Sequence, residues 1–595
     1  MIIIANIDEL YPFKLTLIKN QVIQKTKNMA HKIVLLVVLA HASLTNACTN
    51  FMVSPGATTD GSTIMGYSCD GPPFAALSHY PAQPPHSKRQ LKRKGCAEEG
   101  PSRGEIEEEK ATYNTVGLTN EHAVSVGETT FGGIDFLRGT GNLTYYDVME
   151  LALQSSTTAR ELITKIDQLI SIYGYGGTPN VTEGGGWGTG ESFTVADTKE
   201  VWHMELIGMG NWSKGAVWIA KRVPDGFVGG HANQARITTF PRNDPDNCMF
   251  SNNVVSFAVT AGLYPATAPI EDFSFADAYD PISFSGARFC DARVWSFFSQ
   301  VAEPGFEERY VSYVTGKNLS HRMPLFVKAS KKVSVTEFFG YMRNHYEHTA
   351  LSDQDISSGP LHTEFRVSPS HWMSHNQTYV NERHVGVPYT STTYVAQLRG
   401  WLPAPIGALN WFSVDDSTFS VHAPFHAGST RVPVSYTNAA GSADRFSFDS
   451  AFWVFNMVAN FAYYRWDQVA PVVSETIRQY EQKFVQEVAA NDAAALDLWN
   501  SNHTAAAIEL LTAAGEKRGN DLVSEWLQLY QELFMKFRDG STPRNEVHGV
   551  EVTAGYAQDW YDRVAKDTGD RYLMPESENN ELNARKLEVL RKNRL

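Results

Sequence analysis

The chain has 595 residues, of which 43% are hydrophobic and 19% charged, and its formal net charge is −14. This composition is that of an ordinary globular protein and excludes a disordered or fibrous chain. The negative charge argues against nucleic acid as a partner, because nucleic-acid binding depends on a basic surface that neutralises phosphates.

The N-terminal residues carry the pattern of a secretory signal. Residues 29–32 include the positively charged Lys32, residues 33–40 are apolar, and small and polar residues lead to Ala47. This order is typical of a signal peptide that is cut after Ala47. The apolar run is much shorter than the roughly 20 residues that cross a bilayer. We therefore predict that residues 1–47 are removed, that the mature protein is secreted or endolysosomal, and that it has no membrane span.

Cleavage after Ala47 would make Cys48 the first residue of the mature chain. A thiol and a free α-amino group would then belong to one residue. An α-amino group with a pKa of about 7.7–8.0 can accept the thiol proton at neutral pH, so no separate histidine is needed. Three other interpretations of Cys48 remain: a disulfide, an inert buried thiol, or a lipid attachment site. The last needs a lipobox, in which leucine usually stands where this chain has Thr45.

The number of cysteines is odd. Secretion permits disulfides, and pairing of four cysteines leaves one free thiol, which could be Cys48 or Cys69. The five cysteines are Cys48, Cys69, Cys96, Cys248 and Cys290, and the six sequons compatible with glycosylation begin at Asn142, Asn180, Asn211, Asn318, Asn376 and Asn502.

The residues after Cys48 predict strands first. Residues 49–54 and 62–67 suit a hairpin, because turn-forming residues separate them. Residues 71–110 are rich in proline and charge and predict a long surface loop. Apolar alternation predicts a second hairpin at residues 111–127.

Helical signals follow, with helices expected at residues 146–153 and between Thr158 and Gly174. Residues 174–190 are dense in glycine but lack phosphate-loop spacing, so we expect a loop beside a site and not a nucleotide-binding loop. Strands are then expected at residues 191–197, 200–207, 216–223, 254–258, 392–399 and 413–421, and helices at residues 292–301 and 335–345.

This order of strands, helices, strands and helices favours an α+β layered domain over a doubly wound sheet. After residue 452 the chain has helical periodicity and few strand signals. Helices are expected there at residues 452–465, 469–490, 491–511 and 522–537.

The residues around Cys48 resemble a known family. Cys48-Thr49-Asn50, followed by residues 57–63 and then residues 66–70, is similar to the start of the dipeptidase family of N-terminal-nucleophile (Ntn) cysteine hydrolases. That family includes bacterial dipeptidase A and the secernins and is related to choloylglycine hydrolases. The similarity extends from Cys48 to about Glu481. Shorter similar segments follow in the same order at residues 117–121, 190–193, 200–202, 231–237 and 397–399.

The resemblance implies a fold and a domain order. The expected fold is a four-layer αββα Ntn-hydrolase sandwich with a helical C-terminal region. The expected domain order is a removed segment at residues 1–47, a peptidase domain at residues 48–470 and the helical region at residues 471–595.

The resemblance also implies roles for single residues. Tyr67 stands near the place where many relatives have an arginine. The implied catalytic residues are Cys48 as nucleophile, Asp70 to orient the ammonium or thiol, Asn233 as an amide donor to the oxyanion and Arg399 as polar support, and the implied substrate-binding residues are Tyr67, Asn120 and Glu191.

The function that follows is a cysteine-type dipeptidase that hydrolyses dipeptides or short peptides. No cofactor or metal is expected, because the chain has no H-E-x-x-H motif and its histidines lack metal-ligand spacing. Two alternatives stay open: an N-acyl amide hydrolase of the same superfamily, and a secreted binding glycoprotein in which Cys48 forms a disulfide.

Overall fold

The computed structural model describes residues 48–94, 99–108, 110–177, 189–355, 358–365, 371–540, 545–547, 550–552 and 555–592. The predicted signal segment and most of the glycine-dense loop lie outside these residues. The chain divides into two compact units, and the larger comprises residues 46–366 and 382–595. The described part of the smaller unit is a hairpin of β17 (His371–Ser374) and β18 (Gln377–Val380).

The larger unit contains a seven-stranded antiparallel sheet, here called the first sheet. The predicted hairpin at residues 49–67 is confirmed, and its second strand is central and buried along its whole length. The strand order is β16 (Phe326–Lys328), β14 (Phe227–His231), β1 (Thr49–Val53), β2 (Thr63–Asp70), β19 (Thr390–Leu398), β20 (Ala408–Val414) and β21 (Ala423–His426).

An eight-stranded sheet, the second sheet, contains the predicted meander of residues 191–223 as three consecutive antiparallel strands. The predicted hairpin at residues 111–127 contributes shorter strands to its other side. The strand order is β15 (Cys248–Phe250), β13 (Ala216–Arg222), β12 (Val201–Gly208), β11 (Gly190–Ala196), β8 (Ser125–Phe131), β7 (Thr119–Asn120), β6 (Thr115–Val116) and β3 (His79–Tyr80).

The two sheets pack against each other through β1, β2, β8 and β11. Asn50 Nδ2 donates to the backbone oxygen of Glu128 at 2.6 Å, and Thr129 Oγ1 lies 2.6 Å from His231 Nδ1. Directly before these contacts in β8 is Gly127, where a Cβ atom would clash with Asn50 Oδ1 and press on Tyr67. Glycine at this position therefore lets the backbones of the two sheets approach.

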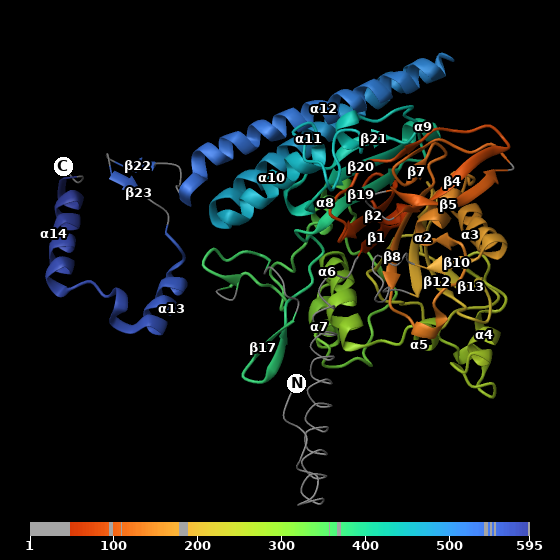
Figure 1. The fold of residues 1–595 in the computed structure, drawn as a ribbon, viewed down its shortest axis with the longest axis horizontal. Coiled ribbons are helices and arrows are strands. Elements are labelled where there is room, and N and C mark those ends of the chain that lie inside the picture. The colour runs from red at the N-terminus through yellow and green to blue at the C-terminus, as the bar shows by residue number, and fades with distance from the viewer. Residues whose placement is uncertain are drawn as a thin grey trace, which may run out of the picture. The chain divides into compact units, whose positions relative to one another are not determined.

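Helices cover the outer faces of both sheets (Figure 1). α2 (Tyr145–Leu153) and α3 (Ala159–Tyr173) lie against the second sheet, and α3 begins at a Thr158 cap and ends at Gly174, as predicted. On the first sheet, α6 (Ala292–Val301) stacks Phe297 on Phe51 of β1 with ring centroids 4.5 Å apart. α8 (Val335–Tyr341) places Phe339 against Trp411 of β20 at 5.2 Å.

Three predictions of local structure are wrong. Residues 254–258 form a helix, α4 (Val254–Thr260), because Val254, Phe257 and Ala258 are buried at helical spacing despite their strand propensity. The strand predicted at residues 413–421 ends at Val414, where Asp415 has a left-handed φ of 65°.

The third is the surface loop at residues 71–110. Part of it is a hairpin of β4 (Ser87–Lys94) and β5 (Glu99–Glu108). Lys88 Nζ and Glu105 Oε1 pair across this hairpin at 3.1 Å.

The C-terminal region is helical, as expected, but its helices are longer. α11 runs unbroken from Trp466 to Asn500, and α12 from Thr504 to Phe537. Trp526 of α12 stacks on Phe455 of α10 (Ala451–Tyr464) with ring centroids 4.9 Å apart.

Further helices and strands lie between and after these parts. None of the helices in the described part of the chain is long and apolar enough to cross a membrane. The remaining elements are β9 (Leu143–Thr144), β10 (Tyr175–Gly177), α5 (Phe275–Tyr279), α7 (Phe306–Val314), α9 (Ala404–Gly407), β22 (Asn545–Val547), β23 (Val550–Val552), α13 (Gln558–Thr568) and α14 (Glu576–Lys592).

The contact at Gly127 gives a test of the sheet packing. We expect Gly127→Ala to lower the free energy of unfolding by about 1–3 kcal/mol, because the added methyl group must push the two sheets apart. The control is Gly340→Ala, on a helix where nothing lies within 4 Å of the added Cβ. Thermal unfolding followed by circular dichroism measures both variants, and equal midpoints would contradict the packing described.

Candidate active site

Cys48 lies directly before β1 and is buried, with 4% of its surface exposed. Its sulfur is 3.6 Å from Glu128 Oε1 and 3.9 Å from Tyr67 Oη. Tyr67 Oη also donates to Glu128 Oε1 at 2.8 Å. These three side chains form a closed set of contacts, here called the Cys48 cluster. Tyr67 was predicted from the sequence, and Glu128 was not.

The ionisation of the thiol is governed mainly by burial. Burial raises the pKa of Cys48 well above its usual value, and the negative charges of Glu128 and Asp70 raise it further. Hydrogen bonds from the Asp70 backbone and from the Tyr67 hydroxyl lower the pKa of the same thiol. The balance keeps the thiol protonated, so a nucleophilic Cys48 requires a base beside it.

Asp70 ends β2 and is fully buried. Its carboxylate accepts from Thr390 Oγ1 at 2.6 Å and forms an ion pair with Arg383. Burial raises the pKa of Asp70, while the Arg383 charge and the Thr390 hydroxyl oppose that rise. Asp70 therefore contacts Cys48 through the Asp70 backbone. The Asp70 carboxylate is held instead by Thr390 and Arg383, two residues that the sequence did not indicate.

Arg293 of α6 is a further residue that sequence reasoning missed. It is 1% exposed, and its Nη1 donates to the backbone oxygen of Cys48 at 2.7 Å and to Thr49 Oγ1 at 2.8 Å. Its Nη2 donates to Asn233 Oδ1 at 2.8 Å. One guanidinium thus holds both the first residue of the predicted mature chain and Asn233. The signal in the sequence was an arginine inside the apolar run of residues 292–298.

A π-helical turn at residues 286–291 leads into Arg293 and α6. Such turns are frequent at functional sites.

Asn233 follows β14 and has a left-handed φ of 67°, which asparagine tolerates better than most residues. Its Nδ2 donates to the Thr130 backbone oxygen at 2.6 Å, which uses one of its two amide hydrogens. Arg293 therefore links Asn233 to Cys48. The bond to Thr130 does not use the second amide hydrogen of Asn233.

Glu191 of β11 extends the Cys48 cluster. Its carboxyl group is hydrogen-bonded to that of Glu128, and Tyr175 Oη donates to Glu191 Oε1 at 3.4 Å. Both glutamates are fully buried. Burial raises the pKa of Glu128 to about 7, against the lowering effect of hydrogen bonds from Tyr67, Glu191 and Cys48. Two adjacent buried carboxyl groups of this kind share a proton near neutral pH.

Asn120 is not placed in the Cys48 cluster. Its Nδ2 donates to the backbone oxygens of Leu153 and Ser156, each at 2.7 Å, and its Oδ1 accepts from the backbone of His122 and Val124. These bonds use the donors and acceptors of the amide to hold the β7–β8 turn against the end of α2.

Arg399 lies at the opposite end of the first sheet. β19 pairs Thr390 with Asp70 but Leu398 with Thr63, so Arg399 is separated from the Cys48 end by roughly 23 Å at about 3.3 Å per residue. Its guanidinium donates to the Ile406 backbone oxygen at 2.8 Å and pairs with Asp492 of α11. The structure therefore does not bring Arg399 to the cluster.

The cysteines differ in part from expectation. Cys69 is disulfide-bonded, whereas Cys48, Cys248 and Cys290 are free thiols. The alternative in which Cys48 forms a disulfide is therefore wrong for this structure. Burial raises the pKa of both Cys248 and Cys290 to about 11, which disfavours their thiolates.

One cluster of side chains has the spacing of metal ligands. Donor atoms of His345, Glu347 and Glu364 lie within 4.8 Å of one another. His345 Nδ1 is 3.2 Å from an oxygen of each glutamate, and these two carboxylates raise the pKa of His345 to about 10. An imidazolium bound by two carboxylates accounts for this spacing without a metal.

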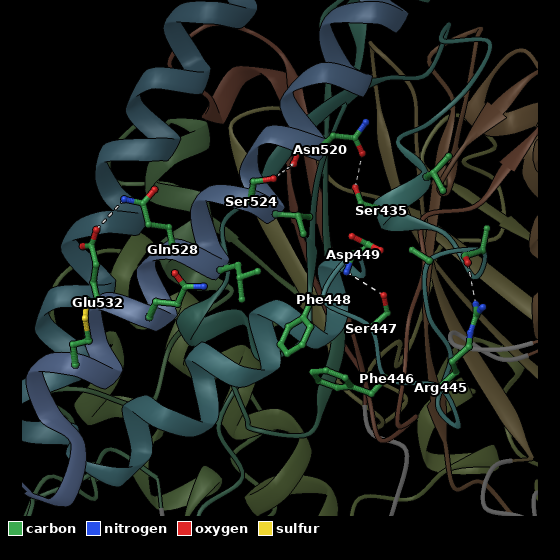
Figure 2. Close-up of a pocket in the computed structure, with 17 residues that line it drawn as sticks. Ser435, Arg445, Phe446, Ser447, Phe448, Asp449, Asn520, Ser524, Gln528 and Glu532 are labelled. Atoms are coloured by element: carbon green, nitrogen blue, oxygen red, sulfur yellow. Dashed lines mark hydrogen bonds between the residues drawn. The ribbon is translucent and has the colours of Figure 1, made fainter.

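A groove with a volume of about 1170 Å³ lies between α12 and residues 434–449 (Figure 2). Phe446 and Phe448 line it from the loop, and Gln528 and Glu532 line it from the helix. None of its lining residues belongs to the Cys48 cluster, so this groove is a separate feature of the surface.

The part of the chain that contains the Cys48 cluster is similar to known proteins. Residues 47–479 match the family model described as Peptidase family C69. A probable dipeptidase of Latilactobacillus sakei is 22% identical over 435 residues, which cover 70% of this chain and 80% of that protein. A probable dipeptidase of Salmonella dublin is 26% identical, over 64% of this chain and 81% of that protein. Dipeptidase A of Lactobacillus helveticus is 21% identical, over 73% and 85%.

The role of Arg293 can be tested by its removal. We expect Arg293→Met to lower the free energy of unfolding by about 1–3 kcal/mol for each buried acceptor that loses its partner. Thiol alkylation of Cys48, located by mass spectrometry, should become faster because the start of β1 is released. Arg309→Met is the control, since that arginine is exposed and pairs with an exposed Glu303. If the two variants behave alike, Arg293 does not hold Cys48.

Proposed function

Because the chain belongs to peptidase family C69, we propose that it is a cysteine-type dipeptidase whose nucleophile is Cys48. The observation that carries the proposal is the position of this free thiol. It lies at the start of β1, touches Tyr67 and Glu128, and its backbone oxygen is held by Arg293. The similarity to proteins named dipeptidases supports a dipeptide as substrate.

Maturation is part of the proposal. In the full chain the nitrogen of Cys48 is an amide bonded to Ala47 and cannot accept a proton. Cleavage of that bond, by removal of a secretory signal at residues 29–47, turns it into an amine. The new amine supplies the base that the buried thiol lacks. Before it is removed, the same signal directs the chain into the secretory pathway, where the sequons can be glycosylated, and so to a secreted or endolysosomal location.

The reaction has two steps. The Cys48 sulfur attacks the carbonyl carbon of the peptide bond, and its proton passes through the α-amino group of Cys48 to the leaving amine as the C–N bond breaks. A water molecule then attacks the thioester and releases the first amino acid, and the sulfur takes back a proton. Each step forms an oxyanion, which the second amide hydrogen of Asn233 stabilises.

Other residues of the site position these groups. Arg293 orients Asn233 by donating to its Oδ1, and it holds Cys48 through the backbone. Asp70, fixed by Thr390 and Arg383, orients the new amino group.

The two sheets with helices on both outer faces support the four-layer αββα Ntn sandwich as the fold of residues 48–470. Residues 471–595 form the helical addition to it.

Substitution of the nucleophile tests the mechanism. We expect Cys48→Ala to lose at least about 10³-fold of the hydrolysis of glycyl-leucine, because no other described thiol is placed to attack. Its thermal midpoint should be close to that of the unchanged protein. Cys248→Ala, which removes a free buried thiol on β15, is the control and should keep its activity. Full activity of purified Cys48→Ala would show that another group is the nucleophile.

Sequencing of the N-terminus tests the maturation step. The protein purified after secretion from a eukaryotic host should begin at Cys48. An Ala47→Arg variant should resist cleavage, because a signal cleavage site needs a small residue, and it should be inactive while the thiol is still present. An uncut chain that hydrolyses dipeptides at the normal rate would contradict the role of the amine.

A further inference from the structure

The geometry of a dipeptide limits where its amino group can lie in this site. The carbonyl that the thiol attacks belongs to the first residue, so its carbon is two bonds from the α-nitrogen, or about 2.5 Å. A carbon poised for attack lies about 3–3.5 Å from the sulfur. The α-ammonium group is therefore within roughly 6 Å of Cys48 Sγ.

Glu128 lies within that range. Its Oε1 is 3.6 Å from Cys48 Sγ, so it can accept a hydrogen bond from an ammonium group attached next to the scissile carbonyl. Glu191 is hydrogen-bonded to the Glu128 carboxyl and belongs to the neighbouring strand of the second sheet. The hydroxyl groups of Tyr67 and Tyr175 donate to these carboxyl groups and fix their orientation.

The chemistry of the pair suits a cation. Two buried carboxyl groups that share one proton carry a single negative charge, which balances the single positive charge of an ammonium group. A neutral N-acyl group offers no such charge and would leave a desolvated carboxylate beside it, which is costly. The pair therefore favours a free amino terminus over an acylated one.

We propose that Glu128, supported by Glu191, binds the α-ammonium group of the first residue of the substrate and so restricts hydrolysis to peptides with a free amino terminus. The proposal rests on the proposed function, because it takes Cys48 as the nucleophile. It assigns Glu128 to substrate recognition and Glu191 to positioning.

A rival role for Glu128 is to bind the α-ammonium group of the mature Cys48 itself. The two roles predict different kinetics. Loss of a substrate contact changes the ratio of kcat/KM between substrates with and without an amino group. Loss of a contact to the enzyme's own amine lowers kcat for both substrates by the same factor.

The test uses glycyl-leucine and its analogue without the amino group, acetyl-leucine, with the full mature enzyme. In Glu128→Gln we expect KM for glycyl-leucine to rise at least tenfold and its preference over acetyl-leucine to fall at least tenfold. Glu191→Gln should show a smaller change in the same direction. An unchanged preference in Glu128→Gln, with kcat lowered for both substrates, would overturn the proposal in favour of the rival role.

The matched control is Glu205→Gln. Glu205 is also a fully buried glutamate, and burial raises its pKa to about 7, but its carboxylate accepts from the backbone of Arg236 and Ile237. This variant should keep both KM and the preference between substrates. A loss of preference in Glu205→Gln equal to that in Glu128→Gln would mean that any buried glutamine has the effect and would also overturn the proposal.

A measurement of binding needs no substitution in the pair. The Cys48→Ser variant should bind glycyl-leucine at least tenfold more tightly than acetyl-leucine in calorimetry. Equal affinities would overturn the proposal even if Glu128→Gln failed to fold. If the unchanged enzyme cleaves neither compound, or cleaves them without Cys48, the proposed function itself fails, and that result is separate from a failure of the recognition by Glu128.

The pH dependence gives a second readout. Burial raises the pKa of Glu128 to about 7, so below this pH the carboxyl group becomes neutral and loses its attraction for an ammonium group. The ratio of kcat/KM for glycyl-leucine to that for acetyl-leucine should therefore fall as the pH drops through about 7, and Glu128→Gln should remove this dependence. Protonation of the Cys48 amine affects both substrates alike and cancels in the ratio. A ratio that falls with pH in Glu128→Gln as it does in the unchanged enzyme would assign the titration to another group and overturn the proposal.

Discussion

The guanidinium of Arg293 is the interaction on which the Cys48 site depends. It is buried in α6 and reaches the backbone of Cys48, the Thr49 hydroxyl and the Asn233 side chain. Because a guanidinium presents several donors in a fixed plane, one side chain sets the distance between the start of β1 and the residue that follows β14. The proposed nucleophile and the proposed oxyanion donor are thereby held by a third element.

The carboxyl groups around Cys48 are given different surroundings, and this separates their roles. Asp70 has an arginine, Arg383, as its partner, so a charge of opposite sign stabilises its anion. Glu128 is instead held by Tyr67 and by a second carboxyl group, that of Glu191, and its pKa is about 7. Different partners for similar acidic side chains are typical of sites that assign separate tasks to them.

Sequence reasoning succeeded where the signal is local. The β1–β2 hairpin, the cap of α3 at Thr158 and the meander β11–β13 follow from turn residues, caps and alternation within short windows. It failed at α4, where strand-forming valines lie in a helix because that spacing buries them. Local propensity is weak compared with burial in the core.

What the sequence by itself determined is the position of Cys48 after a signal-like segment, with Tyr67 and Asp70 on the paired strand. These residues are close in the chain, so a hairpin is enough to bring them together. Only the tertiary structure decided that Glu128 and Arg293, 80 and 245 residues further along, complete the site, and that Arg399 lies at the other end of the sheet. The packing of two sheets and a helix sets those distances, and no spacing along the chain encodes them.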